Sequence, residues 1–140
     1  MLLGEHCIKA WSITQPVIAL SSGEAEYYSL VKGASVALGI VGMLRDFGCE
    51  VNIVMHTDSS AAKGIGSRRG LGKVRHIELS QLWLQEKVVA GAVLIRKISG
   101  NDNNSDSLTK HSGIDRIKQT LRGVNQDVVR GRHPIMPRMA

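Results

Sequence analysis

The strongest structural signal in the sequence is a long helical pattern between Ser21 and Gly48. Ser21 followed by Glu24 is a capping box, with Ser21 as the N-cap. Gly48 is a typical residue at the end of a helix. The segment therefore predicts a helix with one apolar side, whose members recur at intervals of three and four: Leu30, Ala34, Ala37, Val41 and Leu44.

Short apolar segments on both sides of this helix have the composition of strands. Residues 6–13 alternate between apolar and polar, and residues 16–20 are apolar and follow a turn-prone Thr-Gln-Pro, so we expect two tightly joined strands. Residues 51–57, "VNIVMHT", predict a buried strand. Residues 92–99, "AVLIRKIS", predict a fourth strand.

The remaining segments predict shorter helices. We expect one over residues 58–65, a stronger one over 76–91, and two more over 106–111 and 113–123. The order β-β-α-β-α-α-β-α predicts an α/β domain, with a mixed sheet and helices packed on it. We expect this domain to cover residues 1–122 and a disordered basic tail to cover 123–140.

The charge of the chain favours a polyanionic partner. The formal net charge is +6, and nucleic acid is the commonest partner of such a chain. We expect no membrane partner, because the apolar run from Ala34 to Leu44 is too short to span a bilayer. Cys7 and Cys49 lack metal-binding spacing and are expected to be reduced, partly buried thiols. The predicted location is intracellular, either cytoplasmic or nuclear.

Much of the positive charge is concentrated in one glycine-broken segment between Asp58 and Glu78. This segment contains five Lys or Arg residues and no acid: Lys63, Arg68, Arg69, Lys73 and Arg75. It is either a solvated loop or a surface that binds a phosphate backbone.

Glu24 and Glu26 begin the long helix with different expected surroundings. At about 100° per residue, Glu26 falls inside the apolar stripe and Glu24 falls outside it. Glu24 is therefore expected to be a solvated capping acid. A buried acid needs a partner or a metal ion, so Glu26 either binds such a group or reaches solvent at the helix start.

Two further acids, Asp58 and Asp106, also lie at predicted helix starts. Each is explained by N-capping when taken alone. Asp58, however, follows a predicted sheet strand, where α/β proteins place ligand sites. Together with Glu26, these acids could bind divalent metal through oxygen ligands and clamp a phosphodiester. No pair of histidines has zinc spacing, so His56, His76 and His111 are expected to be surface or satisfied residues.

Four motifs resemble the ribonuclease H region of copia-type retrotransposon polyproteins. They are "AWSITQPVIALSSGEAEYYSL", "HTDSSAAKGI", "KVRHIELSQLWLQEKV" and "NNSDSLTKH", in the family's order, and the resemblance covers Met1 to Lys110. It implies a ribonuclease H-like fold that cleaves the RNA strand of RNA–DNA hybrids, using Mg²⁺ with Mn²⁺ as an alternative. It also implies that Glu26, Asp58 and Asp106 are the catalytic and metal-binding acids. The implied partners are an RNA–DNA hybrid or other nucleic acid, and a reverse transcriptase segment upstream in a longer polyprotein.

The resemblance has two departures. The family's first strand, with its own catalytic Asp, should precede Met1, so we expect an N-terminally truncated domain with impaired hydrolysis. The loop before Asp106 also lacks the histidine that ribonucleases H often carry there. The alternative is a non-catalytic nucleic-acid-binding remnant of the same domain, and a third possibility is an unexpressed or unfolded remnant.

Overall fold

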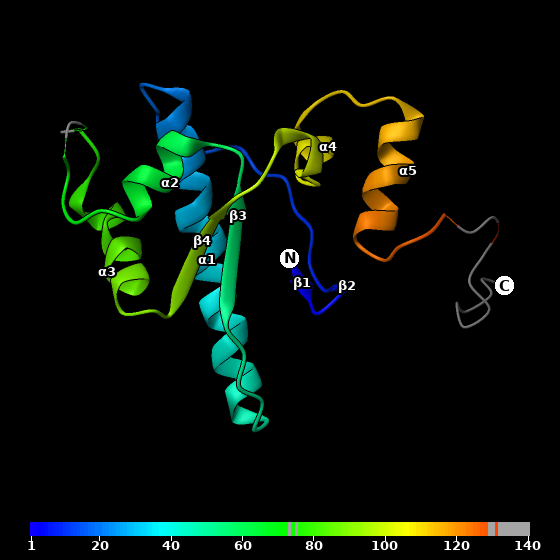
Figure 1. Cartoon of the computed structure of the whole chain (residues 1–140), viewed down its shortest axis with the longest axis horizontal. Coiled ribbons are helices and arrows are strands. Elements are labelled where there is room, and N and C mark those ends of the chain that lie inside the picture. Colours follow the sequence, from blue (N-terminus) through cyan, green and yellow to red (C-terminus); the bar gives the residue numbers. More distant parts are fainter. Residues whose placement is uncertain (73, 75, 129–130, 132–140) are drawn as a thin grey trace, which may run out of the picture. The chain divides into compact units, whose positions relative to one another are not determined.

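The computed structural model describes residues 1–72, 74, 76–128 and 131 of the chain (Figure 1). These residues form two compact units. The central unit is Ser12–Asn103, and the terminal unit combines Met1–Trp11 with Asn104–Ala140. Most of the tail expected over residues 123–140 lies outside the described residues.

The centre of the central unit is a parallel pair of strands, β3 (Ile53–Thr57) and β4 (Val93–Lys97). Both strands were expected, and the structure confirms them with shorter bounds. Their register runs from Ile53 opposite Val93 to Thr57 opposite Lys97, so both strands end at the same edge. On one face Ile53, Val93 and Ile95 are buried, whereas on the other face Val54 and Leu94 are 43% and 47% exposed.

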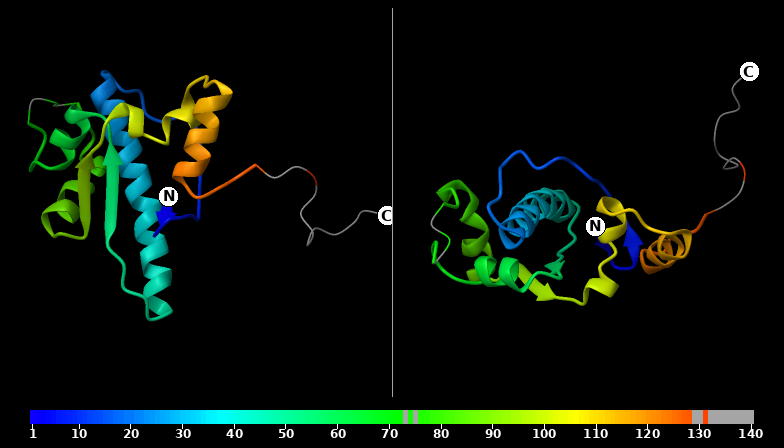
Figure 2. Two further views of the ribbon diagram at one scale, coloured as in Figure 1. Left: turned by 45° about the vertical axis from the view of Figure 1, so that its right-hand side comes forward. Right: turned by 90° about the horizontal axis from the view of Figure 1, so that it is seen from above.

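Helix α1 (Ser22–Asp46) packs its N-terminal half into the core of the central unit. It contacts α2 and β3, and both views of Figure 2 show it running beside the strands. Ser21 is the N-cap, as predicted, because its hydroxyl accepts the Glu24 N–H at 3.2 Å.

The C-terminal end of α1 also follows the prediction. Gly48 has a φ of 77°, which favours glycine. Its N–H donates to the Arg45 carbonyl, and the Cys49 N–H donates to the Leu44 carbonyl. Cys49 itself is exposed, so the expectation of a partly buried thiol was wrong at this position.

By length and composition, α1 is long and apolar enough to cross a membrane. The expectation that its apolar run is too short was therefore wrong, because the helix extends well beyond residues 34–44. Core helices of globular proteins pass the same test, and Tyr27, Leu30 and Val31 of α1 are buried within the central unit.

Short helices connect the strands of the central unit. Helix α2 (Ser60–Gly66) follows β3, and the 3₁₀ helices η1 (Leu79–Gln81) and η2 (Gly100–Asp102) flank α3 (Trp83–Val89) and β4. The helix expected over residues 76–91 is thus a 3₁₀ turn followed by a short α-helix that ends before Gly91, whose φ is 74°.

The terminal unit contains a small hairpin and two helices. Strands β1 (Leu2–Leu3) and β2 (His6–Cys7) pair antiparallel, and α4 (Asp106–Thr109) and α5 (Ile114–Gly123) confirm the expected C-terminal helices. No side chain described in this unit is buried.

The two strands expected before the long helix were largely wrong. Of residues 6–13 only His6 and Cys7 are in a strand, and residues 16–20 form none. Sequence alternation favours a strand only where a neighbour supplies hydrogen bonds and a buried face. Here Ile13 and Ile18 are 58% and 86% exposed. The fold is therefore mixed α/β, with two separate two-stranded sheets among the described residues.

Candidate functional site

Asp58 lies directly after β3, at the edge where the two parallel strands end. The N-cap of α2 is Ser59, whose hydroxyl accepts the Ala62 N–H at 3.1 Å, so the expectation that Asp58 caps this helix was wrong. A Cβ placed on Gly100, the first residue of η2 after β4, would lie 3.6 Å from Asp58 Oδ2. Among the described residues, the half-buried Asp58 carboxylate has no hydrogen-bond or ion-pair partner. It is therefore available to a ligand.

A cation that the sequence did not single out lies at the same end of the sheet. Lys97 is the last residue of β4 and stands opposite Thr57, the neighbour of Asp58. Its exposed ammonium group donates a hydrogen bond to Ser60 Oγ at the start of α2. The strand ends thus place a carboxylate and an ammonium group at the edge of the sheet where α/β proteins bind ligands.

The structure decides the surroundings of the two acids of α1: the expectation that Glu24 is solvated was wrong, and Glu26 follows the alternative in which it reaches solvent. Glu24 is 1% exposed, whereas Glu26 is exposed. The expected stripe relied on Ala37 and Leu44, which are only half-buried. Burial is concentrated in the first half of α1, at Gly23, Glu24, Tyr27, Tyr28, Leu30, Val31 and Ala34.

Three donors satisfy the buried Glu24 carboxylate. The Tyr28 hydroxyl donates to Oε1 at 2.7 Å, and the Leu20 N–H donates to Oε2 at 2.9 Å. His76 Nε2 lies 2.6 Å from Oε2. Burial alone would raise the pKa of Glu24. The hydrogen bonds from Tyr28, His76 and Leu20 outweigh burial and hold this pKa below its ordinary value of 4.5.

Asp106 belongs to the terminal unit and is the first residue of α4. The N-cap is Ser105, so the capping role expected for Asp106 was wrong. The half-buried Asp106 carboxylate forms an ion pair with Lys110, with Oδ2 and Nζ 2.7 Å apart.

The sequence-predicted acids are thus divided between the units. Glu26 and Asp58 belong to the central unit and Asp106 to the terminal unit. Within the described part of the chain, no three His, Cys, Asp or Glu side chains form a group that could hold a metal ion. The described side chains therefore do not make a complete metal site by themselves.

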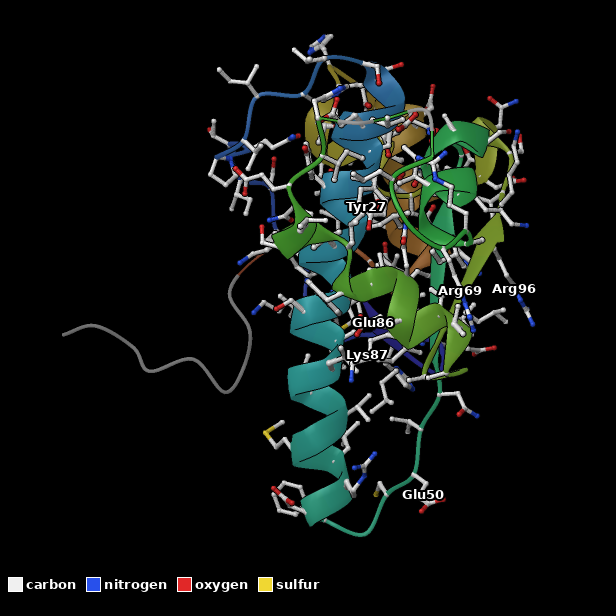
Figure 3. The ribbon with its side chains drawn as sticks, turned by 90° about the vertical axis from the view of Figure 1, so that its left-hand side faces the viewer. Tyr27, Glu50, Arg69, Glu86, Lys87 and Arg96 are labelled. Carbon is white, nitrogen blue, oxygen red and sulfur yellow. The ribbon has the colours of Figure 1, made fainter. Side chains whose placement is uncertain are left out.

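The basic loop, residues 67–77 between α2 and η1, contains most of the predicted phosphate-binding residues. Arg69 is exposed, as Figure 3 shows, whereas Arg68 donates a hydrogen bond to the Leu71 carbonyl. Lys63, half-buried in α2, precedes the loop. Lys73 and Arg75 lie outside the described residues.

Two polar side chains hold this loop: Gln85, which the sequence analysis did not single out, and Glu24, which it expected to be solvated. Gln85 of α3 is 4% exposed; its amide accepts the Gly70 N–H at 2.8 Å and donates to the Gly70 and Ile65 carbonyls at 3.1 and 2.9 Å. Glu24 holds the far end of the loop through His76. Because each partner is distant in sequence, no local pattern indicates these contacts. His56 and His111 are exposed, so the prediction of surface or satisfied histidines is confirmed.

Sequence comparison relates this chain to mobile-element proteins. It is 29% identical over 98 residues to the retrovirus-related Pol polyprotein from transposon TNT 1-94 of Nicotiana tabacum, across 69% of this chain. The chain is similar to a short part of plant transposon Pol polyproteins. Those from transposons RE2 and RE1 of Arabidopsis thaliana are 29% and 28% identical over 111 residues, across 77% of this chain. The matched part is only 7–8% of each relative's length. No family model and no solved structure matches the chain.

Proposed function

We propose that this chain is the ribonuclease H-like part of a retrotransposon Pol polyprotein and that it acts on RNA–DNA hybrids. Two observations support the proposal before the site is considered. The chain is similar to Pol polyproteins of plant transposons, and its four motifs occur in the order of the ribonuclease H region that they resemble. The proposed chemistry is metal-dependent hydrolysis of the RNA strand.

The observation that carries the proposal is the position of Asp58. This acid directly follows strand β3, and it does not cap α2, because the N-cap of that helix is Ser59. The Asp58 carboxylate lacks a protein partner among the described residues, although it is half-buried. A half-buried acid without a protein partner, at the carboxyl ends of parallel strands, is typical of a ligand site in α/β proteins.

In this proposal Glu26, Asp58 and Asp106 supply oxygen ligands to Mg²⁺, with Mn²⁺ as an alternative. When bound, the metal would stabilise the attacking and leaving oxygens of a phosphodiester. Among the described residues no three His, Cys, Asp or Glu side chains form a metal-binding group, so this assignment rests on the family resemblance and on the position of Asp58. The family resemblance implies one further acid, an Asp on a strand outside these 140 residues.

A second candidate function is nucleic-acid binding without hydrolysis. The observation that favours it is the basic loop, whose contacts to Gln85 and to Glu24 through His76 do not involve the three proposed catalytic acids. A loop held in this way could bind a phosphate backbone whether or not the metal site is complete. Cleavage of the RNA strand separates this candidate from the first.

Both candidates require the basic loop to bind phosphate, and Arg69 tests this. Replacing Arg69 with Ala should weaken binding to an RNA–DNA hybrid and reduce the log–log salt slope by about 1, because one phosphate contact is lost. The measurement is the Kd of a labelled hybrid over a series of salt concentrations.

The matched control is Lys87→Ala. Lys87 is an exposed cation of α3, and Figure 3 shows it at a separate place on the surface from Arg69. This variant should keep the wild-type salt slope. Equal slopes for all three proteins would show that the loop is not the phosphate site.

A further inference from the structure

Glu24 stands out as a buried acid that the proposed chemistry does not use. It is 1% exposed, and its carboxylate receives the Tyr28 hydroxyl and the Leu20 N–H. Its third partner, His76, is separated from it by 52 residues and has a side chain that is 44% exposed. The Glu24 carboxylate thus joins the start of α1 to the C-terminal end of the basic loop.

Gln85 makes the corresponding connection at the other side of the loop. Its buried amide both accepts from and donates to the backbone of Gly70. A two-sided contact of this kind fixes the position of a backbone segment more strictly than a single hydrogen bond does. The segment from Gly70 to His76 is therefore held at each end by a buried polar side chain.

The loop between these anchors also has internal contacts. Leu71 and Val74 pack against the core, and the Val74 N–H donates to the Leu71 carbonyl at 3.2 Å. Arg68 contributes from just before the segment, because its guanidinium binds the Leu71 carbonyl.

We propose that Glu24 and Gln85 are positioning residues that fix the two ends of the basic loop, Gln85 at Gly70 and Glu24 through His76, and that this anchoring strengthens the binding of a nucleic-acid backbone. This inference rests on the proposed function for its ligand, but the anchoring itself does not. A loop whose two ends are fixed loses less conformational entropy on binding and therefore binds more tightly. Anchoring should change affinity without changing the number of phosphates contacted.

His76 is the position at which to test the proposal. Its side chain is partly exposed, so His76→Ala should leave the fold intact while Glu24 keeps its bonds from Tyr28 and Leu20. His76→Gln retains an N–H donor and should restore the link. His56→Ala is the matched control, because His56 is an exposed histidine of β3 outside the anchor.

Limited trypsin digestion of the full chain measures the anchoring without nucleic acid. Trypsin cleaves after Lys and Arg, and Lys73 and Arg75 lie between the two anchors. His76→Ala should be cut there about tenfold faster than the wild type, because a hydrogen bond to a charged group is lost. Cleavage after Lys87 in α3 should be unchanged. Equal loop cleavage in His76→Ala and the wild type, both folded by circular dichroism, would overturn the proposal.

Hybrid binding gives the second measurement. His76→Ala should weaken the Kd several-fold with an unchanged salt slope, unlike Arg69→Ala, and His76→Gln should bind like the wild type. A reduced salt slope in His76→Ala, or an equal loss in His56→Ala, would mean that the histidine acts through its charge and would overturn the positioning role. If the wild type binds no hybrid, the proposed function fails, and the trypsin result still decides the anchoring.

Discussion

At the scale of single residues, the core places two adjacent tyrosine hydroxyls in contact with different parts of the central unit. The Tyr27 hydroxyl donates to the Gln81 carbonyl at 2.7 Å, and the Tyr28 hydroxyl donates to the Glu24 carboxylate at the same distance. Burial raises the pKa of Tyr27 to about 12. Burial, together with the hydrogen bond to Glu24, raises the pKa of Tyr28 to about 12.

We predict that no tyrosine of the native protein ionises near its ordinary pKa of 10.0. The chain has two tyrosines, so tyrosinate absorbance reports these two side chains alone. Because both pKa values are raised on folding, their contribution to stability is present below pH 10 and is lost as the pH rises towards about 12. The denatured protein is the control and should titrate near pH 10. Half of the tyrosinate signal appearing near pH 10 in the folded protein would contradict the prediction.

Glu24 and Glu26 show where sequence analysis reaches its limit at this scale. The capping role of Ser21 could be predicted, because it depends on the next three residues. Which of the two acids is buried could not be predicted, because burial depends on which side of α1 packs against the rest of the central unit. The partner of Glu24 on that side, His76, is brought there by the fold.

At the scale of elements, the approach of α1 to α2 depends on a glycine. A Cβ placed on Gly23 would lie 2.6 Å from the Ala61 Cβ, which is closer than real Cβ atoms come. This close contact fixes how α2 lies across the start of α1. Because Asp58 and Ser59 lead directly into α2, the contact also helps to position the candidate site.

We predict that Gly23→Ala destabilises the protein by about 1–3 kcal/mol, the usual cost of overpacking, despite the better helix propensity of Ala. Ala61→Gly removes the side-chain atom that the new methyl group meets. The double variant Gly23→Ala/Ala61→Gly should therefore be more stable than the sum of the two single effects indicates. Urea unfolding of the four proteins measures this coupling. Additive effects would mean that the two positions do not constrain each other.

Elements with strong local signals were predictable from the sequence. Helix α1, strands β3 and β4 and the C-terminal helices were all expected where they occur. The strands expected before α1 do not form because alternation in residues 8–20 cannot by itself supply a pairing partner. The position of Asp58 just after a strand was predicted correctly. The sequence could not show which of Asp58 and Ser59 caps α2, because both residue types are favoured N-caps.

At the scale of the whole molecule, the hydrophobic core lies entirely within the central unit, and all of its buried members fall between Tyr27 and Ile95. In the described part of the chain, β3 pairs with β4 alone, so its other edge is without a strand. Val54 and Leu94 expose apolar side chains on the outer face of the same sheet. An unpaired edge beside an apolar face favours pairing with a further strand.

The open edge of β3 bears directly on the proposed hydrolysis. The ribonuclease H resemblance assigns a strand ending in Asp to the position beside β3. Such a strand would pair with the free edge and add an oxygen ligand close to Asp58. We therefore predict that adding this strand to the sheet also gives the protein metal-dependent hydrolysis.

The most direct test is magnesium-dependent cleavage of the RNA strand of an RNA–DNA hybrid by three proteins. They are the 140-residue protein, a version extended before Met1 by a strand ending in Asp, and the extended version with Asp58→Asn. We predict cleavage by the extended protein and little or none by the other two. This prediction would be contradicted if the 140-residue protein cleaved as fast as the extended one, or if Asp58→Asn left the extended protein's rate unchanged.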